Sequence, residues 1–216
     1  QAILQLLDLI KDRPDIWIFS DECYEQLTYD IPFKSIATFN SSLSNIITFQ
    51  SCSKTYAMTG WRIGYLAGDV ELVKAISKLQ GQSTSCPNSI AQYAAIEALT
   101  GDQSCVDKMK NIFHQRRDLI LKELYNIDNI TCETPNGAFY VFPNIDYYLN
   151  TQTSDGLSIQ TSSDLSLYLL EKTGVVTVAG DSFGAPQNIR LSYATSDDTI
   201  ITASQLIKSA LKKLKK

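Results

Sequence analysis

Apolar and polar positions divide the first 126 residues into short apolar runs and longer stretches of helical spacing. The apolar residues between positions 3 and 10 recur at helical spacing and predict a helix over 2–12, which the sequence RPD ends. IWIFSDE is an apolar run that ends in acids, a pattern typical of a strand buried on both faces. NIITFQSCSK and RIGYLAG repeat this design. The same helical spacing predicts further helices over 70–81, 88–100 and 103–126.

The pattern changes after about residue 127, where the predicted strands become shorter. ITCETPNGAFYVFPNI contains a turn between two strand-like runs, and residues 150–163 are typical of a polar loop. A helix closed by Gly174, the strands VVTVAG and NIRLSYAT, and a helix with acids at its start and bases at its end follow. The sequence therefore predicts an α/β protein with one unit over 1–126 and a smaller α/β unit over 127–216.

Composition narrows the class of protein. The 216 residues are 44% hydrophobic and 19% charged, as in a globular protein with a core. The net charge of -4 and the lack of a membrane-length apolar run predict neither a nucleic-acid nor a membrane partner. The five scattered cysteines lack the spacing of a disulfide framework or a zinc site, so we expect no metal and a reducing, cytoplasmic compartment.

Lys54 stands directly after an apolar run, in the sequence SCSK. A desolvated lysine beside other cations loses its proton more readily and can form a Schiff base. A strand-end lysine that reaches solvent is the more ordinary explanation for this residue alone. Ser51, Ser53 and Arg62 offer hydroxyl and guanidinium donors suited to a phosphate, although a polar turn with a structural ion pair fits them equally.

Asp21 ends a predicted strand, where a buried acid needs a partner. One such partner is the protonated ring nitrogen of pyridoxal phosphate, and Tyr24 could donate to the ring oxygen of that cofactor. The alternative is a turn cap at Asp21 and a half-buried Tyr24. We interpret Glu22 as structural, because it points to the other side of the strand.

Arg190 interrupts the apolar strand NIRLSYAT and could bind a substrate carboxylate with two hydrogen bonds. Alternation with its neighbours favours a plain outward-facing residue. His114, beside Arg116 and Arg117 in a predicted helix, is interpreted as part of a solvated helix face.

Together these motifs resemble one family in order and over essentially the whole chain. SCSKTYAMTGWRIG is similar to the lysine-site motif of class I (fold-type I) pyridoxal-phosphate-dependent aminotransferases, in the aspartate-aminotransferase-like branch. SDECYEQLTYD is similar to the segment that holds the acid and the tyrosine on the cofactor ring. PNGAFYVF and IRLSYATS are similar to signatures of the small domain.

The resemblance implies a fold and a set of roles. The fold would be the second half of the large PLP-transferase domain over 1–126, a mixed, mostly parallel sheet with helices, plus a small α/β domain over 127–216. Lys54 would hold the cofactor as a Schiff base and shuttle a proton, while Asp21 would keep the ring nitrogen protonated and Tyr24 would bond the ring oxygen. The resemblance also implies that Ser51, Ser53 and Arg62 would bind the phosphate and that Arg190 would bind the substrate α-carboxylate.

The implied reaction moves an amino group between an L-amino acid, by default aspartate, and a 2-oxo acid, by default 2-oxoglutarate. Aromatic amino acids and prephenate are alternatives, and the full-length enzyme is expected to be a homodimer. Residues 137–140 would lie near the substrate entrance or form a plain hairpin turn, and residues 83–89 would line the dimer-shared site.

The resemblance also implies a portion of a longer enzyme. The chain begins at Gln1, inside a helical pattern and where the family's asparagine loop should end, so we expect an N-terminally truncated piece. Such a piece supplies half of the pocket and is expected to bind the cofactor poorly by itself. The alternative hypothesis is a non-catalytic remnant that serves as a binding or structural module.

Overall fold

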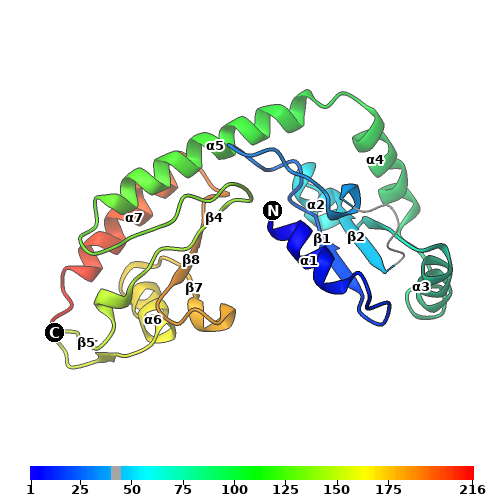
Figure 1. Cartoon of the computed structure of the whole chain (residues 1–216). Helices are drawn as coiled ribbons and strands as arrows, with labels where there is room; N and C mark the ends of the chain where they lie inside the picture. The colour runs from blue at the N-terminus through cyan, green and yellow to red at the C-terminus, as the bar shows by residue number, and fades with distance from the viewer. Residues whose placement is uncertain (40–44) are drawn as a thin grey trace. The chain divides into compact units, whose positions relative to one another are not determined.

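The structure, a computed structural model, describes residues 1–39 and 45–216 (Figure 1). Packing divides the chain into unit 1, Gln1–Lys110, and unit 2, Asn111–Lys216. This division falls inside the long helix α5, Ser104–Tyr125. The domain boundary after residue 126 stays a prediction. Among the helices in the described part of the chain, none is long and apolar enough to cross a membrane.

Unit 1 is built on a three-stranded mixed sheet in the order β1-β2-β3. β1 (Ile18–Asp21) runs parallel to β2 (Ile46–Ser51), and β3 (Gly64–Ala67) runs antiparallel to β2. Parallel strands end at the same edge of a sheet, so β1 and β2 both end there. Because β3 runs the other way, it begins at that edge, with Gly64 opposite Ser51.

The helices of unit 1 are α1 (Ala2–Ile10), the single turn α2 (Cys52–Thr55), α3 (Val70–Ser83) and α4 (Ser89–Thr100), with 3₁₀ turns η1 (Ile36–Thr38) and η2 (Thr59–Trp61). Three of them, α1, α3 and α4, agree with the predicted ranges to within two residues, whereas the short turns were not predicted. Asp69 and Asn88 cap α3 and α4 by accepting hydrogen bonds from the first free backbone N–H groups. Asn88 therefore has a structural role within residues 83–89.

The prediction that IWIFSDE is buried on both faces is wrong. Along β1, half-buried and exposed residues alternate, and the Phe19 side chain is 65% exposed. The opposite face is covered, since Leu7 and Ile10 of α1 pack in one cluster with Ile46 of β2. A run of apolar residues cannot distinguish one covered face from two, because the number of covering layers is a property of the tertiary structure.

Unit 2 has an antiparallel sheet in the order β4-β8-β7, formed by β4 (Tyr140–Val141), β8 (Ile189–Ser192) and β7 (Val178–Ala179). Its other elements are α6 (Ser162–Thr173), α7 (Asp197–Leu211), η3 (Asp146–Tyr148) and η4 (Gly180–Phe183). Gly174 closes α6 at φ 74°, as predicted. α7 runs beside the second half of α5 in Figure 1, and Arg116 Nε lies 3.0 Å from Asp197 Oδ1.

Residues 150–163 are more ordered than the predicted polar loop. They contain a hairpin of β5 (Thr151–Gln152) and β6 (Ser158–Ile159). The Thr153 hydroxyl accepts a hydrogen bond from the Leu157 N–H at 2.9 Å and so closes the turn. Ile159 is fully buried in the core of unit 2. Hydroxyl-to-backbone bonds of this kind give a Ser/Thr-rich segment a defined turn.

Candidate cofactor site

A pocket of about 400 Å³ lies at the edge of the unit 1 sheet where β1 and β2 end. Its lining includes five residues predicted from the sequence: Asp21, Ser51, Ser53, Lys54 and Arg62. The antiparallel direction of β3 explains how Arg62 reaches this edge, because it stands just before the first residue of β3. Cys23, Phe49, Gln50 and Thr59 complete the lining and were not singled out in the sequence.

Lys54 belongs to the single helical turn α2, which begins directly after β2. The Ser51 hydroxyl caps this turn by accepting a hydrogen bond from the Ser53 N–H at 3.1 Å. Lys54 Nζ lies 5.9 Å from the centre of the Tyr24 ring, within the range of a cation–π contact. Tyr24 and Lys54 are thus neighbours although 30 residues of sequence separate them.

Asp21 is exposed at the end of β1, and one of its carboxylate oxygens accepts a hydrogen bond from the Cys23 N–H at 3.2 Å. This bond is the turn cap that the alternative interpretation predicted, but the same carboxylate also lines the pocket. Burial raises the pKa of the Cys23 thiol to about 11, helped by its hydrogen bond to Asp21 and the charge of Asp21 and opposed by the charge of Lys54. Cys23 therefore stays a neutral thiol beside the lysine amine.

Arg62 is held in an unusual backbone conformation. Its φ of 54° and ψ of 49° lie in the left-handed region, which costs energy for a residue with a side chain. Its guanidinium Nη1 donates to the main-chain oxygen of Thr59 at 2.8 Å. A side-chain carbon at Gly64 would lie 2.7 Å from the main-chain oxygen of Gln50, so only glycine fits the start of β3.

Glu22 has the structural role that the sequence predicted. The carboxylate is buried and its Oε1 accepts hydrogen bonds from Ser20 Oγ at 3.1 Å, Ser35 Oγ at 3.0 Å and the Ile36 N–H at 3.2 Å. Gln50 donates to Glu22 Oε2 at 3.3 Å and to Glu25 at 2.9 Å. A buried carboxylate needs such donors, and here they join β1 to β2 and to η1.

The pocket residues fit a cofactor that carries a phosphate and a pyridine ring. Hydroxyls, a guanidinium and an ammonium are the donors that a phosphate accepts, and a carboxylate is the partner of a protonated ring nitrogen. All of these groups occur among the residues that line the pocket. A volume of about 400 Å³ is within the range of pockets for small molecules.

Unit 2 contains a larger cavity, of about 510 Å³, between α5, α7 and the segment after α6. Aliphatic and hydroxyl side chains dominate its lining, and Asp198 is the one ionisable residue among the described residues that form it. The pocket in unit 1 is therefore the better candidate for chemistry.

Arg190 belongs to unit 2, where β8 places it as the sequence predicted. Ile189 and Leu191 are buried on one side of the strand, and Arg190 points to the other side. The side chain is half-buried, and its guanidinium carbon lies 4.6 Å from the centre of the Tyr140 ring and 4.8 Å from that of Phe183. Arg190 is thus more constrained than a plain outward-facing residue.

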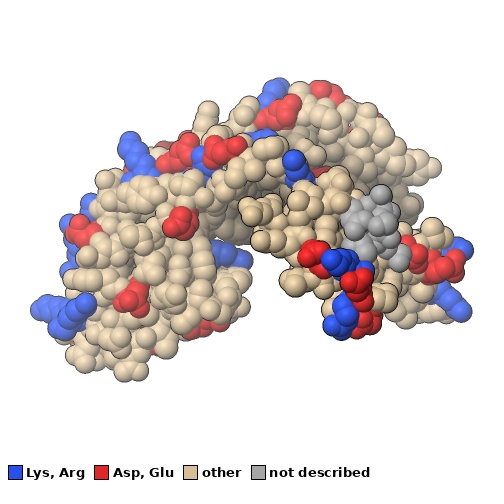
Figure 2. Space-filling model, in the orientation of Figure 1, with Lys and Arg blue, Asp and Glu red and all other residues tan. Residues whose placement is uncertain are grey.

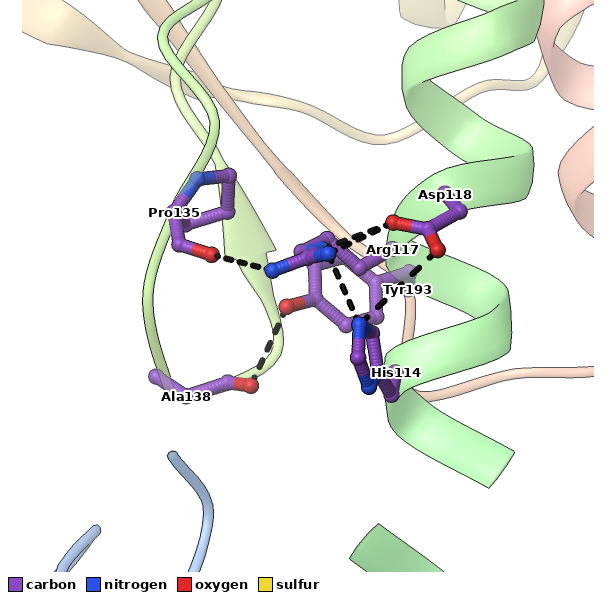
Figure 3. Close-up of polar contacts among 6 residues, drawn as sticks. All are labelled: His114, Arg117, Asp118, Pro135, Ala138 and Tyr193. Atoms are coloured by element: carbon purple, nitrogen blue, oxygen red, sulfur yellow. Dashed lines mark hydrogen bonds and ion pairs between the residues drawn. The ribbon is translucent and has the colours of Figure 1, made fainter. Parts of the chain in front are cut away.

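The prediction of a solvated helix face around His114 is wrong for its neighbour Arg117. Arg117 is buried, with 5% of its surface exposed. It donates to the Pro135 main-chain oxygen at 3.2 Å and to Asp118 Oδ1 at 2.9 and 2.8 Å, and it contacts His114 Nε2 at 2.8 Å (Figure 3). Helical spacing alone did not reveal this, because the Pro135 segment that covers Arg117 lies 18 residues away.

Charged side chains of both signs are scattered over the face shown in Figure 2, most of which is formed by other residues. Lys and Arg side chains lie among Asp and Glu side chains there, in keeping with the net charge of -4.

Comparison with known proteins identifies the family. Residues 1–205 match the family model described as "Aminotransferase class I and II". The chain belongs to this aminotransferase family. The family relation and the structural relatives confirm the mixed α/β fold that was predicted from the sequence.

Three aminotransferases illustrate the relation. The chain is 42% identical over 206 residues to the "Aspartate/prephenate aminotransferase" of Cereibacter sphaeroides, a match that covers 94% of this chain and 52% of the relative. The crystal structure of the aspartate aminotransferase from Rhizobium meliloti has a TM-score of 0.93 and 40% sequence identity, and the match covers 97% of this chain and 53% of that one. The aromatic aminotransferase of Pyrococcus horikoshii has a TM-score of 0.87 and 32% identity, with 97% and 54% covered. The chain spans about half the length of the aminotransferases it matches.

Proposed function

We propose that the protein containing this chain is a pyridoxal-phosphate-dependent aminotransferase that uses Lys54 as its cofactor lysine. The observation that carries the proposal is the pocket in unit 1, which gathers Lys54, Asp21 and Arg62 at one edge of the sheet. Membership of the aminotransferase family supports the same reaction and the same cofactor.

The proposal divides the binding of the cofactor among the site residues predicted from the sequence. Arg62, Ser51 and Ser53 bind the phosphate, and the constrained backbone of Arg62 keeps its donors at the sheet edge. Asp21 holds a proton on the ring nitrogen. Tyr24, whose ring lies beside Lys54, bonds the ring oxygen.

When bound, the cofactor ring draws away the electron pair of a bond broken at the substrate α-carbon. The amine of Lys54 would take the proton from the substrate α-carbon and would later donate it again. The neutral Cys23 thiol does not compete with this amine as a nucleophile at physiological pH, since its pKa is about 11. In unit 2, Arg190 binds the α-carboxylate of the substrate.

The substrates are an L-amino acid and a 2-oxo acid, with aspartate and 2-oxoglutarate as the proposed pair. The names of the relatives support aspartate, and two of them also support prephenate, one of the alternatives predicted from the sequence. We further propose a homodimer, with no nucleic-acid or membrane partner. Cytoplasmic location is supported by the five cysteines, all of which are free thiols.

Covalent attachment of the cofactor tests the proposal. The chain is mixed with pyridoxal phosphate, reduced with borohydride and digested, and the modified lysine is identified by mass spectrometry. Modification is expected at Lys54 and is expected to be absent in Lys54→Ala, whereas Lys34→Ala, which removes an exposed lysine of unit 1, retains it.

Arg62→Ala is expected to raise the cofactor concentration needed for labelling. Labelling spread evenly over exposed lysines would contradict the proposal for this chain and would favour a non-catalytic binding module. An amine-donor screen on the complete protein then tests the substrates, and activity confined to alanine or aromatic donors would overturn aspartate as the donor.

A further inference from the structure

We propose that Tyr140 and Phe183 are positioning residues that hold the Arg190 guanidinium in one orientation for a small carboxylate. The inference rests on the proposed role of Arg190 and names two further residues in that site. It starts from the two ring contacts, at 4.6 and 4.8 Å, that the guanidinium carbon makes.

A guanidinium that lies over aromatic rings keeps its hydrogen-bond donors available. Its N–H groups lie in the plane of the group, while the rings contact its face. A carboxylate can therefore approach along the edge of the guanidinium and accept two parallel hydrogen bonds. An arginine that is already oriented loses less conformational freedom when the ligand binds, which strengthens binding.

The sheet of unit 2 brings Tyr140 to Arg190. Tyr140 pairs with Ser192 across β4 and β8, so Arg190 is its diagonal neighbour on the same face. The backbone before Tyr140 is held at two points, since Arg117 donates to the Pro135 oxygen at 3.2 Å and the Tyr193 hydroxyl donates to the Ala138 oxygen at 3.1 Å (Figure 3).

A separate part of unit 2 fixes Phe183. The turn η4 begins at Gly180, where a side-chain carbon would lie 2.1 Å from the Ala185 main-chain oxygen, so only glycine fits. Asp181 in the same turn accepts a hydrogen bond from Ser162 Oγ at 2.7 Å, which joins η4 to the start of α6. The Phe183 ring also makes an edge contact with Phe142, with centres 5.8 Å apart.

The two ring residues thus have independent supports, one from α5 and β8 and one from α6. Aromatic residues of β4 and η4 converge on a single guanidinium. The sequence motif GAFYVF contributes Tyr140 to this site, a role that neither the entrance nor the hairpin interpretation assigned to it.

Side-chain NMR of the 216-residue chain tests the proposal. The Arg190 Nε–H signal, assigned through Arg190→Lys, reports how ordered the guanidinium is, and a titration with 2-oxoglutarate reports carboxylate binding. We expect an ordered signal in the wild-type chain. In Tyr140→Leu and Phe183→Leu we expect lost order and roughly tenfold weaker binding of 2-oxoglutarate, whereas Tyr140→Phe retains both.

Tyr147→Leu is the matched control, because it removes a tyrosine ring 4.2 Å from another cation, Lys216 Nζ. It is expected to change neither measurement. Phe183 is 49% exposed, so Phe183→Leu carries the test if Tyr140→Leu fails to fold.

Unchanged Arg190 order and unchanged binding in both leucine variants would overturn the proposal. Wild-type chain that shows no response of Arg190 to 2-oxoglutarate would overturn it as well. Cofactor labelling of Lys54 distinguishes these failures from failure of the proposed function, because labelling depends on unit 1 and not on the rings around Arg190.

Discussion

Replacing the buried Arg117 by methionine is expected to destabilise unit 2. Methionine keeps the aliphatic stem of the arginine but removes every donor. The Pro135 oxygen then loses its charged hydrogen bond, and Asp118 loses two bonds from the guanidinium. The contact with His114 Nε2 at 2.8 Å is lost as well.

The size of this loss of stability depends on how exposed each hydrogen-bond partner of Arg117 is. A hydrogen bond between a charged group and a neutral one contributes about 1.5–3 kcal/mol, which sets the loss at the Pro135 oxygen. Asp118 is 59% exposed, so its ion pair contributes only about 0–1 kcal/mol because water replaces the lost bonds. Removing a buried cation also relieves some desolvation. We expect a net loss of about 2 kcal/mol in the free energy of unfolding, within the usual range for point variants.

Hydrogen exchange measured by mass spectrometry suits this test, because it reports unit 2 separately. A loss of about 2 kcal/mol corresponds to roughly 30-fold faster exchange of the slowest amides in α7 and β8. Arg116→Met is the matched control, since Arg116 is the preceding residue and its ion-pair partner Asp197 is exposed. It is expected to change exchange by less than about threefold. Equal effects of the two variants would refute the assignment of stability to the Pro135 bond.

Two further predictions concern unit 1. Gly64→Ala is expected to lower the free energy of unfolding by about 1–3 kcal/mol, because the added carbon would lie 2.7 Å from the Gln50 main-chain oxygen. Urea unfolding followed by tryptophan fluorescence measures this loss, since both tryptophans lie in unit 1. The rate of Cys23 alkylation is expected to keep increasing with pH up to about pH 11. Asp21→Asn is expected to lower the Cys23 pKa, because it removes a hydrogen bond and a negative charge. Because the raised pKa belongs to the folded state, the unfolded chain releases this proton first as the pH rises from about 9 to about 11, so stability falls over that range.

Matched measurements accompany these two predictions. Gly60→Ala serves as the control for Gly64→Ala, because a carbon added at Gly60 meets no atom within 4 Å. Equal destabilisation by both would contradict the steric argument. The exposed Cys86 is the internal reference for alkylation and is expected to react faster than Cys23 at neutral pH. Faster reaction of Cys23 at that pH would contradict the raised pKa.

Local patterns were enough to predict most of the helices. The helices observed at Val70–Ser83, Ser89–Thr100 and Ser104–Tyr125 differ from the predicted ranges by at most two residues at either end. Helical periodicity and the capping residues are properties of a short window of sequence, so they do not depend on the rest of the chain. The order of the site residues along the chain was likewise sufficient to recognise the family.

The tertiary structure decided how those residues meet. The sequence did not show that β3 runs antiparallel to β2, which brings Arg62 to the end of the sheet that carries Lys54. Nor did it show that Phe19 is exposed, that Arg117 is buried, or that the rings of Tyr140 and Phe183 meet Arg190.

These outcomes share a physical reason. Burial and aromatic contact depend on partners that are distant in sequence, such as Tyr140 and Arg190, which adjacent strands place on one face. A periodic pattern records which side of an element is apolar, but it does not record which element covers that side. The sequence by itself therefore determined the helices and the family, and packing determined the geometry of the site.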